Sequence, residues 1–244
     1  MITFMVDVSE TNTIAKALKN VDSMIHLVHI KYIPNVITAC KKAGVNRLTL
    51  IGSTGMFSKY RKYAEEYIEL EKKVDESGLD YTVIRPTMIY GNHLDENIHK
   101  LVKIVDRFRI FPVLGSGENL LQPIYAEDLA RVILNAHRSQ IAIGEKYNVA
   151  GDHPLAFNEI IEEIIRTLNS KTYMFHIPKI ISLVLGRLGD VIPNNLVNYE
   201  RVQRLAEDKD FEYDKAAEEL GFDPMPFEEG IELEVEALRR EGII

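Results

Sequence analysis

The sequence predicts an α/β fold, a doubly wound parallel sheet that continues into a smaller and mostly helical lobe. Two observations lead to this class. In the first 92 residues, short apolar runs alternate with amphipathic segments of helical length, a pattern typical of βαβ units. The apolar runs are nearly continuous, as expected for a parallel sheet that helices cover on both faces. From residue 93 to residue 244 helical patterns dominate, so this second part is predicted to form a lobe interleaved with the sheet.

The elements follow from hydrophobic spacing and from residues that start or stop them. The sheet is expected to use four strands, at Ile2–Val8, Ser23–Ile30, Arg47–Ser53 and Tyr81–Arg85. Between them we expect three helices: one after Ser9, with Ser9 or Thr11 as N-cap, one at Ile33–Cys40 ending at Gly44, and one at Ser58–Glu76. Later helices are predicted at Glu127–His137, Phe157–Leu168, Pro178–Leu188 and Phe227–Arg240, and short strands at Gln122–Tyr125 and Lys146–Ala150.

Composition excludes several function classes. The chain has 244 residues, 46% of them hydrophobic, and 37 acidic against 29 basic residues give a net charge of −8. An acidic protein lacks the cationic surface that general nucleic-acid binding requires. The single cysteine, Cys40, cannot form an internal disulfide, which favours a reducing, cytoplasmic location. The longest uncharged stretch, Leu48–Ser58, is too short to span a membrane, and the start lacks a signal-peptide pattern.

Candidate site residues come from the topology. In a doubly wound sheet, ligands bind outside the carboxyl ends of the strands. The residues at those ends are Asp7–Val8, Val28–His29, Ser53–Thr54 and Pro86–Thr87. Two hydroxyls beside Gly55 suit a polar, open position, although Ser53 and Thr54 could equally cap the next helix. The histidines show no spacing typical of a metal site, so no metal is predicted.

Seven segments, in this order, resemble one known family. They are VDVSE, VDSMIHLVHI, IPNVITACKKAGVNRLTLIGSTG, SGLDYTVIRPTMIYG, LGSGENLLQPIYAEDLARVI, GEKYNVAGDHPLAFNEII and KAAEELGFDPMPFEEGI. Together they resemble the extended and atypical short-chain dehydrogenase/reductases, which include the NAD-dependent epimerases and dehydratases. The resemblance implies a Rossmann-like core at residues 1–92, a substrate lobe at residues 93–244, and NAD or NADP as cofactor. It also implies hydride transfer at a sugar or other alcohol carbon of a small-molecule substrate such as a nucleotide sugar, and leaves a homodimer open.

The resemblance also assigns roles to residues. The cofactor would contact Asp7, Val8, Val28, His29, Ser53 and Pro86, and the substrate would contact Thr87, Gln122 and Tyr125. Thr54 or Ser53 would hydrogen-bond the reacting oxygen, and Tyr63 would carry the proton. Packing is the alternative role for Gln122 and Tyr125, and helix capping is the alternative for Asp7.

Two departures from the family pattern bear on activity. The family begins with a glycine-rich turn that holds the cofactor pyrophosphate, whereas the first glycine here is Gly44. We therefore expect weak or absent NAD(P) binding by this chain. The family also places a lysine four residues after its catalytic tyrosine, and here Tyr67 follows Tyr63 at that spacing. A second phenol is no cation and cannot lower the pKa of the first in the same way.

Three hypotheses follow. The chain is an NAD(P)-dependent oxidoreductase of the epimerase/dehydratase type; or it is a catalytically impaired module that serves as a sensor or assembly subunit; or the sequence is an incomplete version of a complete enzyme. The absent lysine favours the second hypothesis. Ser53–Thr54 and the stretch from Arg85–Pro86 to Tyr90–Gly91 favour the first.

Overall fold

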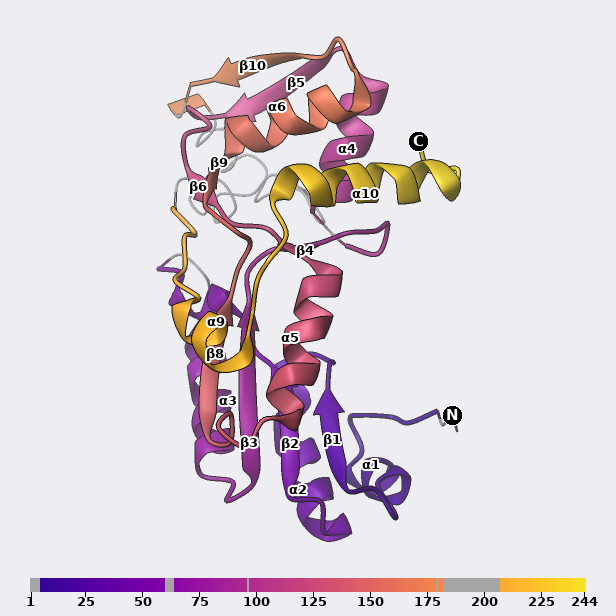
Figure 1. The fold of residues 1–244 in the computed structure, drawn as a ribbon, viewed down its shortest axis with the longest axis vertical. Coiled ribbons are helices and arrows are strands. Elements are labelled where there is room, and N and C mark those ends of the chain that lie inside the picture. Colours follow the sequence, from indigo (N-terminus) through magenta and orange to yellow (C-terminus); the bar gives the residue numbers. More distant parts are fainter. Residues whose placement is uncertain (1–4, 60–63, 96, 179, 182–206) are drawn as a thin grey trace.

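A four-stranded parallel sheet organises the first part of the molecule (Figure 1). The computed structural model describes residues 5–59, 64–95, 97–178, 180–181 and 207–244. The strand order is β1 (Ser23–His26), β2 (Arg47–Ile51), β3 (Asp80–Pro86) and β8 (Glu145–Val149). All three pairings are parallel. The prediction that the runs beginning near Ser23, Arg47 and Tyr81 form neighbouring parallel strands is confirmed, and the run near Lys146 supplies the fourth strand.

Three helices from the first half of the chain cover one face of this sheet. They are α1 (Thr11–Ala17), α2 (Ile33–Ala43) and α3 (Ala64–Asp75). Their apolar sides share one core cluster with residues of β2 and β3, including Ile33, Val36, Leu50, Val74 and Val83. As predicted, α2 ends at Gly44, whose φ of 75° is a left-handed conformation that glycine adopts without strain.

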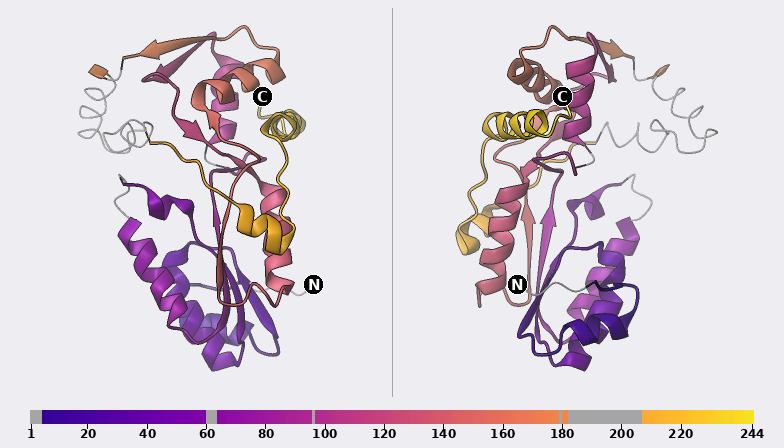
Figure 2. Two further views of the ribbon diagram at one scale, coloured as in Figure 1. Left: turned by 60° about the vertical axis from the view of Figure 1, so that its left-hand side comes forward. Right: turned by 90° about the vertical axis from the view of Figure 1, so that its right-hand side faces the viewer.

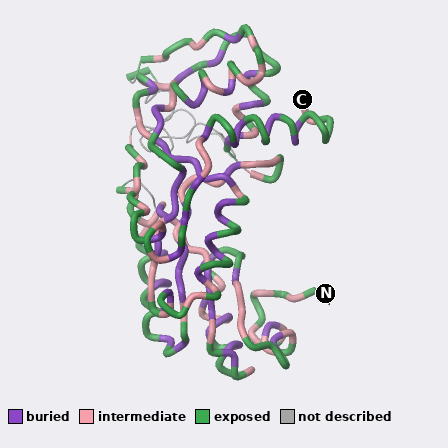
Figure 3. Tube along the Cα trace, viewed as in Figure 1, coloured by how far each residue is buried: buried purple, intermediate pink, exposed green. Residues whose placement is uncertain are grey.

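The opposite face is covered by later segments, α5 (Ala126–Arg138) and α9 (Asp214–Leu220) (Figure 2). Val83 and Ile84 show how one strand serves both layers. Val83 belongs to the core under α2 and α3, and Ile84 belongs to the core under α5. Successive side chains of a strand point to opposite faces, so a continuous apolar run fills both cores. Figure 3 shows the resulting buried stretches along the central strands and α5.

A third core lies among helices beyond the sheet. It is built by α4 (Ile98–Arg107), α6 (Phe157–Leu168) and α10 (Phe227–Arg240), next to the parallel pair β5 (Ile110–Leu114) and β10 (Tyr173–Ile177). Two short pairings connect it to the sheet. These are β4 (Ile89–Tyr90) with β7 (Ile124–Tyr125), and β6 (Leu120–Leu121) with β9 (Leu155–Ala156). The predicted bounds of α6 and α10 match those of the structure.

Several predicted elements differ from the structure. Of the strand expected at Ile2–Val8, residues 5–8 are described, and they form no strand. The Asp7 carboxylate accepts hydrogen bonds from Ser9, and the Asn35 side chain of α2 donates to the Ser9 carbonyl at 2.8 Å, so the backbone turns beside α2 instead. The N-cap of α1 is Glu10, which makes no side-chain capping bond. The hydroxyl of Ser9, one of the two residues predicted to cap this helix, is hydrogen-bonded to Asp7 instead.

The other differences concern helix and strand ends. Thr54–Phe57 forms a short 3₁₀ helix, and α3 is described from Ala64 onward. After β1 the chain turns into a second 3₁₀ helix at Ile30–Tyr32, so β1 is shorter than expected. The strand predicted at Tyr81–Arg85 is one residue longer at each end, so Pro86 is the last residue of β3. Most of the helix predicted at Pro178–Leu188 lies outside the described residues.

Candidate active site at the strand ends

Polar residues follow the carboxyl ends of three adjacent strands. His29 comes after β1, Ser53 and Thr54 come after β2, and Thr87 comes after β3. Because the strands are parallel, these ends meet at one edge of the sheet, below β4 in Figure 1. This is the edge at which doubly wound sheets bind ligands.

The side chains of Ser53 and Thr54 are both held by hydrogen bonds to the backbone. The Ser53 side chain accepts a hydrogen bond from the backbone N–H of Gly55 at 3.0 Å, and so caps the 3₁₀ helix. The buried Thr54 hydroxyl donates to the carbonyl of Pro86 at 3.0 Å and thereby joins the ends of β2 and β3. The structure thus brings Ser53, Thr54 and Pro86 together, as the sequence predicted for neighbouring strand ends.

Tyr67 and His29 form a contact between α3 and the end of β1. The Tyr67 hydroxyl lies 3.2 Å from Nε2 of His29, and the two rings meet edge to face with centroids 5.6 Å apart. Nδ1 of His29 accepts a hydrogen bond from the backbone N–H of Lys31 at 3.1 Å. In the neutral imidazole this assigns the proton to Nε2, which then donates to the phenol. Tyr63 lies outside the described residues.

Asp7 and Val8 lie in the turn before α1 and not at a strand end. Hydrogen bonds from the Ser9 hydroxyl and N–H lower the pKa of Asp7, whose carboxylate is exposed. The carbonyl of Val8 faces the side-chain amide of Asn35 at 3.5 Å. Val28, which directly precedes His29, is exposed.

The three residues predicted to contact substrate lie further along the same edge. The Thr87 hydroxyl donates to the carbonyl of Gln122 at 2.5 Å. The buried Gln122 side chain donates to the Gly151 carbonyl at 2.8 Å and accepts from the Phe211 N–H at 2.9 Å, so it holds three segments together. Tyr125 is buried, and burial together with neighbouring acids raises its pKa.

Two cavities flank the contact between Thr87 and Gln122. One, of about 480 Å³, is lined by Thr87, Met88 and Ala126 among others. The second, of about 620 Å³, is lined by Gln122 and Asn148. Its lining also includes four acidic residues: Asp152, Asp210, Glu212 and Asp214.

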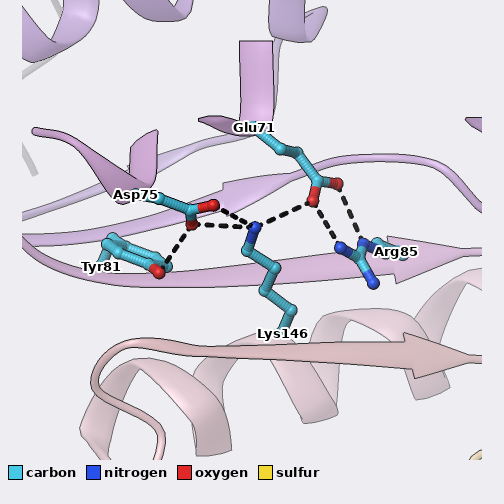
Figure 4. Close-up of polar contacts among 5 residues, drawn as sticks. All are labelled: Glu71, Asp75, Tyr81, Arg85 and Lys146. Carbon is cyan, nitrogen blue, oxygen red and sulfur yellow. Dashed lines mark hydrogen bonds and ion pairs between the residues drawn. The ribbon is translucent and has the colours of Figure 1, made fainter. Parts of the chain in front are cut away.

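An ion-pair network beneath this edge was not predicted from the sequence (Figure 4). Glu71 on α3 is almost completely buried and accepts two hydrogen bonds from the Arg85 guanidinium, at 2.9 and 2.5 Å. The Lys146 ammonium of β8 lies between Glu71, at 3.4 Å, and Asp75, at 2.8 Å. Tyr81 donates to Asp75 at 2.7 Å, and burial together with this bond raises the pKa of Tyr81 to about 12. The network fastens α3 to β3 and β8.

One sequence signal could have revealed this network. Gly52 lies opposite it, and a Cβ at that position would come within 3.1 Å of Glu71 Oε1 and 3.4 Å of Arg85 Cγ. A glycine directly after a buried strand, together with Arg85 near the end of the next strand, indicates a close approach between backbone and side chain.

Within the described parts of the chain, no three His, Cys, Asp or Glu side chains are grouped so that they could hold a metal ion. The helices described there include none that is both long and apolar enough to cross a membrane.

The parallel sheet with helices on both faces and a polar carboxyl edge defines a Rossmann-like α/β protein. A family model described as NAD(P)H-binding matches residues 3–139, more than half of the chain, and the chain belongs to this family. It is 24% identical over 189 residues to N-acetyl-alpha-D-glucosaminyl-diphospho-ditrans,octacis-undecaprenol 4-epimerase of Escherichia coli O157:H7, covering 70% of this chain and 57% of that protein. It is 23% identical to 3beta-hydroxysteroid-dehydrogenase/decarboxylase isoform 2 of Arabidopsis thaliana, covering 92% and 50%. The predicted resemblance to NAD-dependent epimerases and dehydratases is confirmed.

Solved structures of the same fold support this class. UDP-glucose 4-epimerase from Thermotoga maritima, solved with UDP-glucose, superimposes with a TM-score of 0.77 at 16% identity, covering 98% of this chain and 84% of that one. UDP-glucuronic acid 4-epimerase from Bacillus cereus, solved with UDP-glucuronic acid and NAD, gives a TM-score of 0.77 at 14% identity, covering 96% and 80%. The chain spans between half and about three-fifths of the length of the curated relatives named above.

The residues at the strand ends fit the family's dinucleotide only in part. A pyrophosphate needs backbone N–H donors at a glycine-rich turn that opens a helix. The first described helix, α1, has the acidic Glu10 as its N-cap and no glycine in the turn before it. His29, bound to Tyr67, occupies the end of β1. Neither of these two strand-end features supplies the backbone donors of a glycine-rich turn.

Proposed function

We propose that this protein is an NAD(P)-dependent oxidoreductase of the epimerase/dehydratase type that acts on a sugar or other alcohol carbon. The observation that carries the proposal is the placement of Ser53, Thr54 and Thr87 at the carboxyl ends of neighbouring strands, where Thr87 lines a cavity of about 480 Å³. In this proposal Thr54 or Ser53 bonds the reacting oxygen, and Tyr63 moves the proton. Membership of the NAD(P)H-binding family supports the reaction class.

The remaining roles belong to the same proposal. Residues 1–92 form the cofactor part and residues 93–244 the substrate part, with Thr87, Gln122 and Tyr125 on the substrate side. A nucleotide sugar is the first substrate to test, because similar structures were solved with such compounds. A homodimer and a cytoplasmic location stay predictions.

Turnover measurements test the proposal. We expect conversion of UDP-glucose or UDP-glucuronate with NAD or NADP, and loss of that conversion in Thr54→Val. Thr38→Val is the matched control, because Thr38 is exposed on α2 and its hydroxyl bonds the carbonyl of Pro34 on the same helix. Equal turnover in both variants would contradict the role given to Thr54. Absence of turnover with sugar nucleotides and with simple alcohols would contradict the reaction class.

Cofactor affinity gives a second test. About three missing charge-assisted hydrogen bonds, each worth roughly 1.5–3 kcal/mol, move a micromolar site towards the millimolar range. Titration calorimetry with NAD, NADP and their reduced forms is expected to give a Kd above about 10 μM, an order of magnitude weaker than a micromolar site. Tighter binding would show that donors other than a glycine-rich turn hold the pyrophosphate.

The second candidate function is a module without catalysis that acts as a sensor or assembly subunit. One observation favours it: the residue at the position of the family's lysine is Tyr67, and its hydroxyl is engaged by His29. Tyr67→Lys separates the two candidates. If Tyr67→Lys raises turnover and adding Tyr63→Phe removes the gain, the result supports Tyr63 as the group that moves the proton. If the Tyr67→Lys variant is as inactive as the parent, the result favours the module.

A further inference from the structure

Helix α10 carries one acidic residue on its buried side. Glu234 is completely buried beside Ile231 and Val235, within the third core. The other acids of the helix, such as Glu232 and Glu236, are exposed. A lone carboxyl group in an apolar core costs free energy unless it is paired or neutral.

Within the described parts of the chain, no lysine or arginine forms an ion pair with Glu234. Among the described residues, no side-chain donor is hydrogen-bonded to either carboxyl oxygen, and the backbone N–H of Gly91 favours the ionised form. The Tyr90 hydroxyl, which packs against Gly230 one turn earlier on α10, is likewise buried without a partner. Such buried groups are rare in native proteins, so a concentration of them in one place requires an explanation.

The group that faces Glu234 is a second acid, Asp95. The Asp95 side chain is only 5% exposed. Its Oδ1 accepts a hydrogen bond from the N–H of Asn97 at 2.6 Å, and its Oδ2 accepts one from the N–H of His99 at 3.2 Å. These donors hold the Asp95 side chain at the start of α4, where Nδ1 of His99 also lies 3.5 Å from its Oδ1. Asp95 is thus held in place opposite Glu234.

Two carboxylates in such a site cannot both remain ionised, so Glu234 keeps its proton. Burial and the Asp95 carboxylate raise the pKa of Glu234 to about 9, and only the N–H of Gly91 acts in the opposite direction. The other titratable groups around this contact are the phenols Tyr90 and Tyr125, the acids Asp128 and Glu228, and His99, whose Nδ1 lies 3.5 Å from Asp95 Oδ1. At the far end of the helix Glu241 pairs with His93.

The position of this pair connects α10 to the candidate site. Asp95 and Tyr90 line the same cavity of about 480 Å³ that Thr87 lines at the end of β3. We propose that Asp95 and Glu234 form a proton-dependent latch, in which one shared proton holds α10 against the wall of this cavity and loss of that proton releases the helix. This inference stands whether or not the proposed function is correct.

Unfolding by urea between pH 5 and 9.5 tests the latch. Below about pH 4.5 the carboxyl is protonated in both the folded and unfolded chain. Between that value and about 9 only the unfolded chain loses the proton, so stability falls as pH rises. Relative to Glu234→Gln, the unfolding equilibrium constant of the parent is expected to rise about tenfold per pH unit in this interval. Glu236→Gln, which removes the same charge from the exposed face of α10, should follow the parent.

Local opening provides the second measurement. Hydrogen exchange of peptides from residues 227–240 should accelerate with pH more in the parent than in Glu234→Gln, after correction for the intrinsic rate. Parallel stability curves for the parent and Glu234→Gln would overturn the proposal, and so would a Glu234→Gln variant that is less stable than the parent at pH 8.

A third measurement needs no variant. If Glu234→Gln does not fold, carbon-13 NMR of labelled glutamate carboxyl groups in the parent still decides the question. A carboxyl that titrates above about pH 8 supports the latch, and titration of every glutamate below about pH 6 overturns it. Asp95→Asn, which keeps hydrogen-bond acceptors at the start of α4, should lower the pH at which that carboxyl titrates.

Discussion

Glu71 and Glu234 are two buried acids in different parts of the molecule, and their surroundings differ in kind. Glu71 lies between α3 and the sheet, where Arg85 gives it two hydrogen bonds and Lys146 adds a second positive charge. Glu234 lies between α10 and the segment around Asp95, where its neighbours are another carboxylate and a phenol. Equal burial therefore has opposite consequences. The first acid is paired with two basic side chains, whereas burial and the neighbouring Asp95 raise the pKa of the second.

The comparison also indicates where each part of the protein is sensitive to pH. In the sheet layer, half-buried His137 contacts the hydroxyls of Thr49 and Ser23 at 2.9 Å each, whereas His26 Nε2 and Asn148 Oδ1 are buried without hydrogen-bond partners among the described residues. In the helical part, the Tyr90 hydroxyl is buried without a hydrogen-bond partner among the described residues, and Glu234 faces the carboxyl group of Asp95. Because the pKa of His137 is lowered and that of Glu234 is raised, we expect the sheet layer to lose stability in acid and the helical part to lose stability in alkali.

The largest expected effect comes from breaking the ion pair of the sheet layer. Arg85→Ala leaves the Glu71 carboxylate buried with Lys146 as its remaining ion-pair partner among the described residues, and we expect a loss of about 3–5 kcal/mol in the free energy of unfolding. Arg166→Ala, which removes a largely exposed arginine from an ion pair with Glu163, should cost less than about 1 kcal/mol. The measurement is chemical unfolding of both variants.

A second change at the same place provides a check. Adding Glu71→Gln to Arg85→Ala removes the stranded charge, so the double variant should recover part of the lost stability. If Arg85→Ala is no more harmful than Arg166→Ala, the buried charge is compensated in another way and the contrast with Glu234 fails.

An intermediate effect is expected in the helical part. In Gly230→Ala the new Cβ would lie 2.0 Å from the Tyr90 hydroxyl oxygen, so α10 must shift, at a cost of about 1–3 kcal/mol. Tyr90→Phe removes that oxygen, which has no partner among the described residues, and should change stability little. The combination Gly230→Ala with Tyr90→Phe should restore most of the loss in thermal unfolding. If the stability losses of the two single variants simply add in the double variant, the new Cβ does not clash with the Tyr90 hydroxyl.

The smallest expected effect concerns acid sensitivity. Burial and the charge of Arg47 lower the pKa of His137 below its ordinary value of 6.5, so its contribution to stability is present above that pH and declines as pH falls. Between pH 7 and 5 the parent should lose more stability than His137→Gln, by on the order of 1 kcal/mol or less. His153→Gln, a change at an exposed histidine, serves as control. Identical pH profiles for the parent and His137→Gln would exclude His137 as an acid-sensitive group.

The sequence alone determined the layered architecture of this protein. Continuous apolar runs at β1, β2 and β3, separated by amphipathic helices, specify a covered parallel sheet whatever the details of packing. Gly44 ends α2 as predicted, because a left-handed residue at a helix end is a local requirement. The strand-end position of His29, Ser53, Thr54 and Thr87 followed from the same local pattern, since parallel strands place their ends at one edge.

Only the tertiary structure decided which partners these residues meet. The strand expected at Ile2–Val8 is a turn over residues 5–8, because the side chain of Asn35, distant in sequence, holds its carbonyls. The partners of Glu71 and Glu234 likewise come from distant segments, Arg85 and Asp95. Hydrophobic periodicity records which side of an element faces a core, but it carries no information on which charge lies across that core. The charge of the neighbouring side chain affects the pKa of a buried acid, and this neighbour is determined only when the elements pack together.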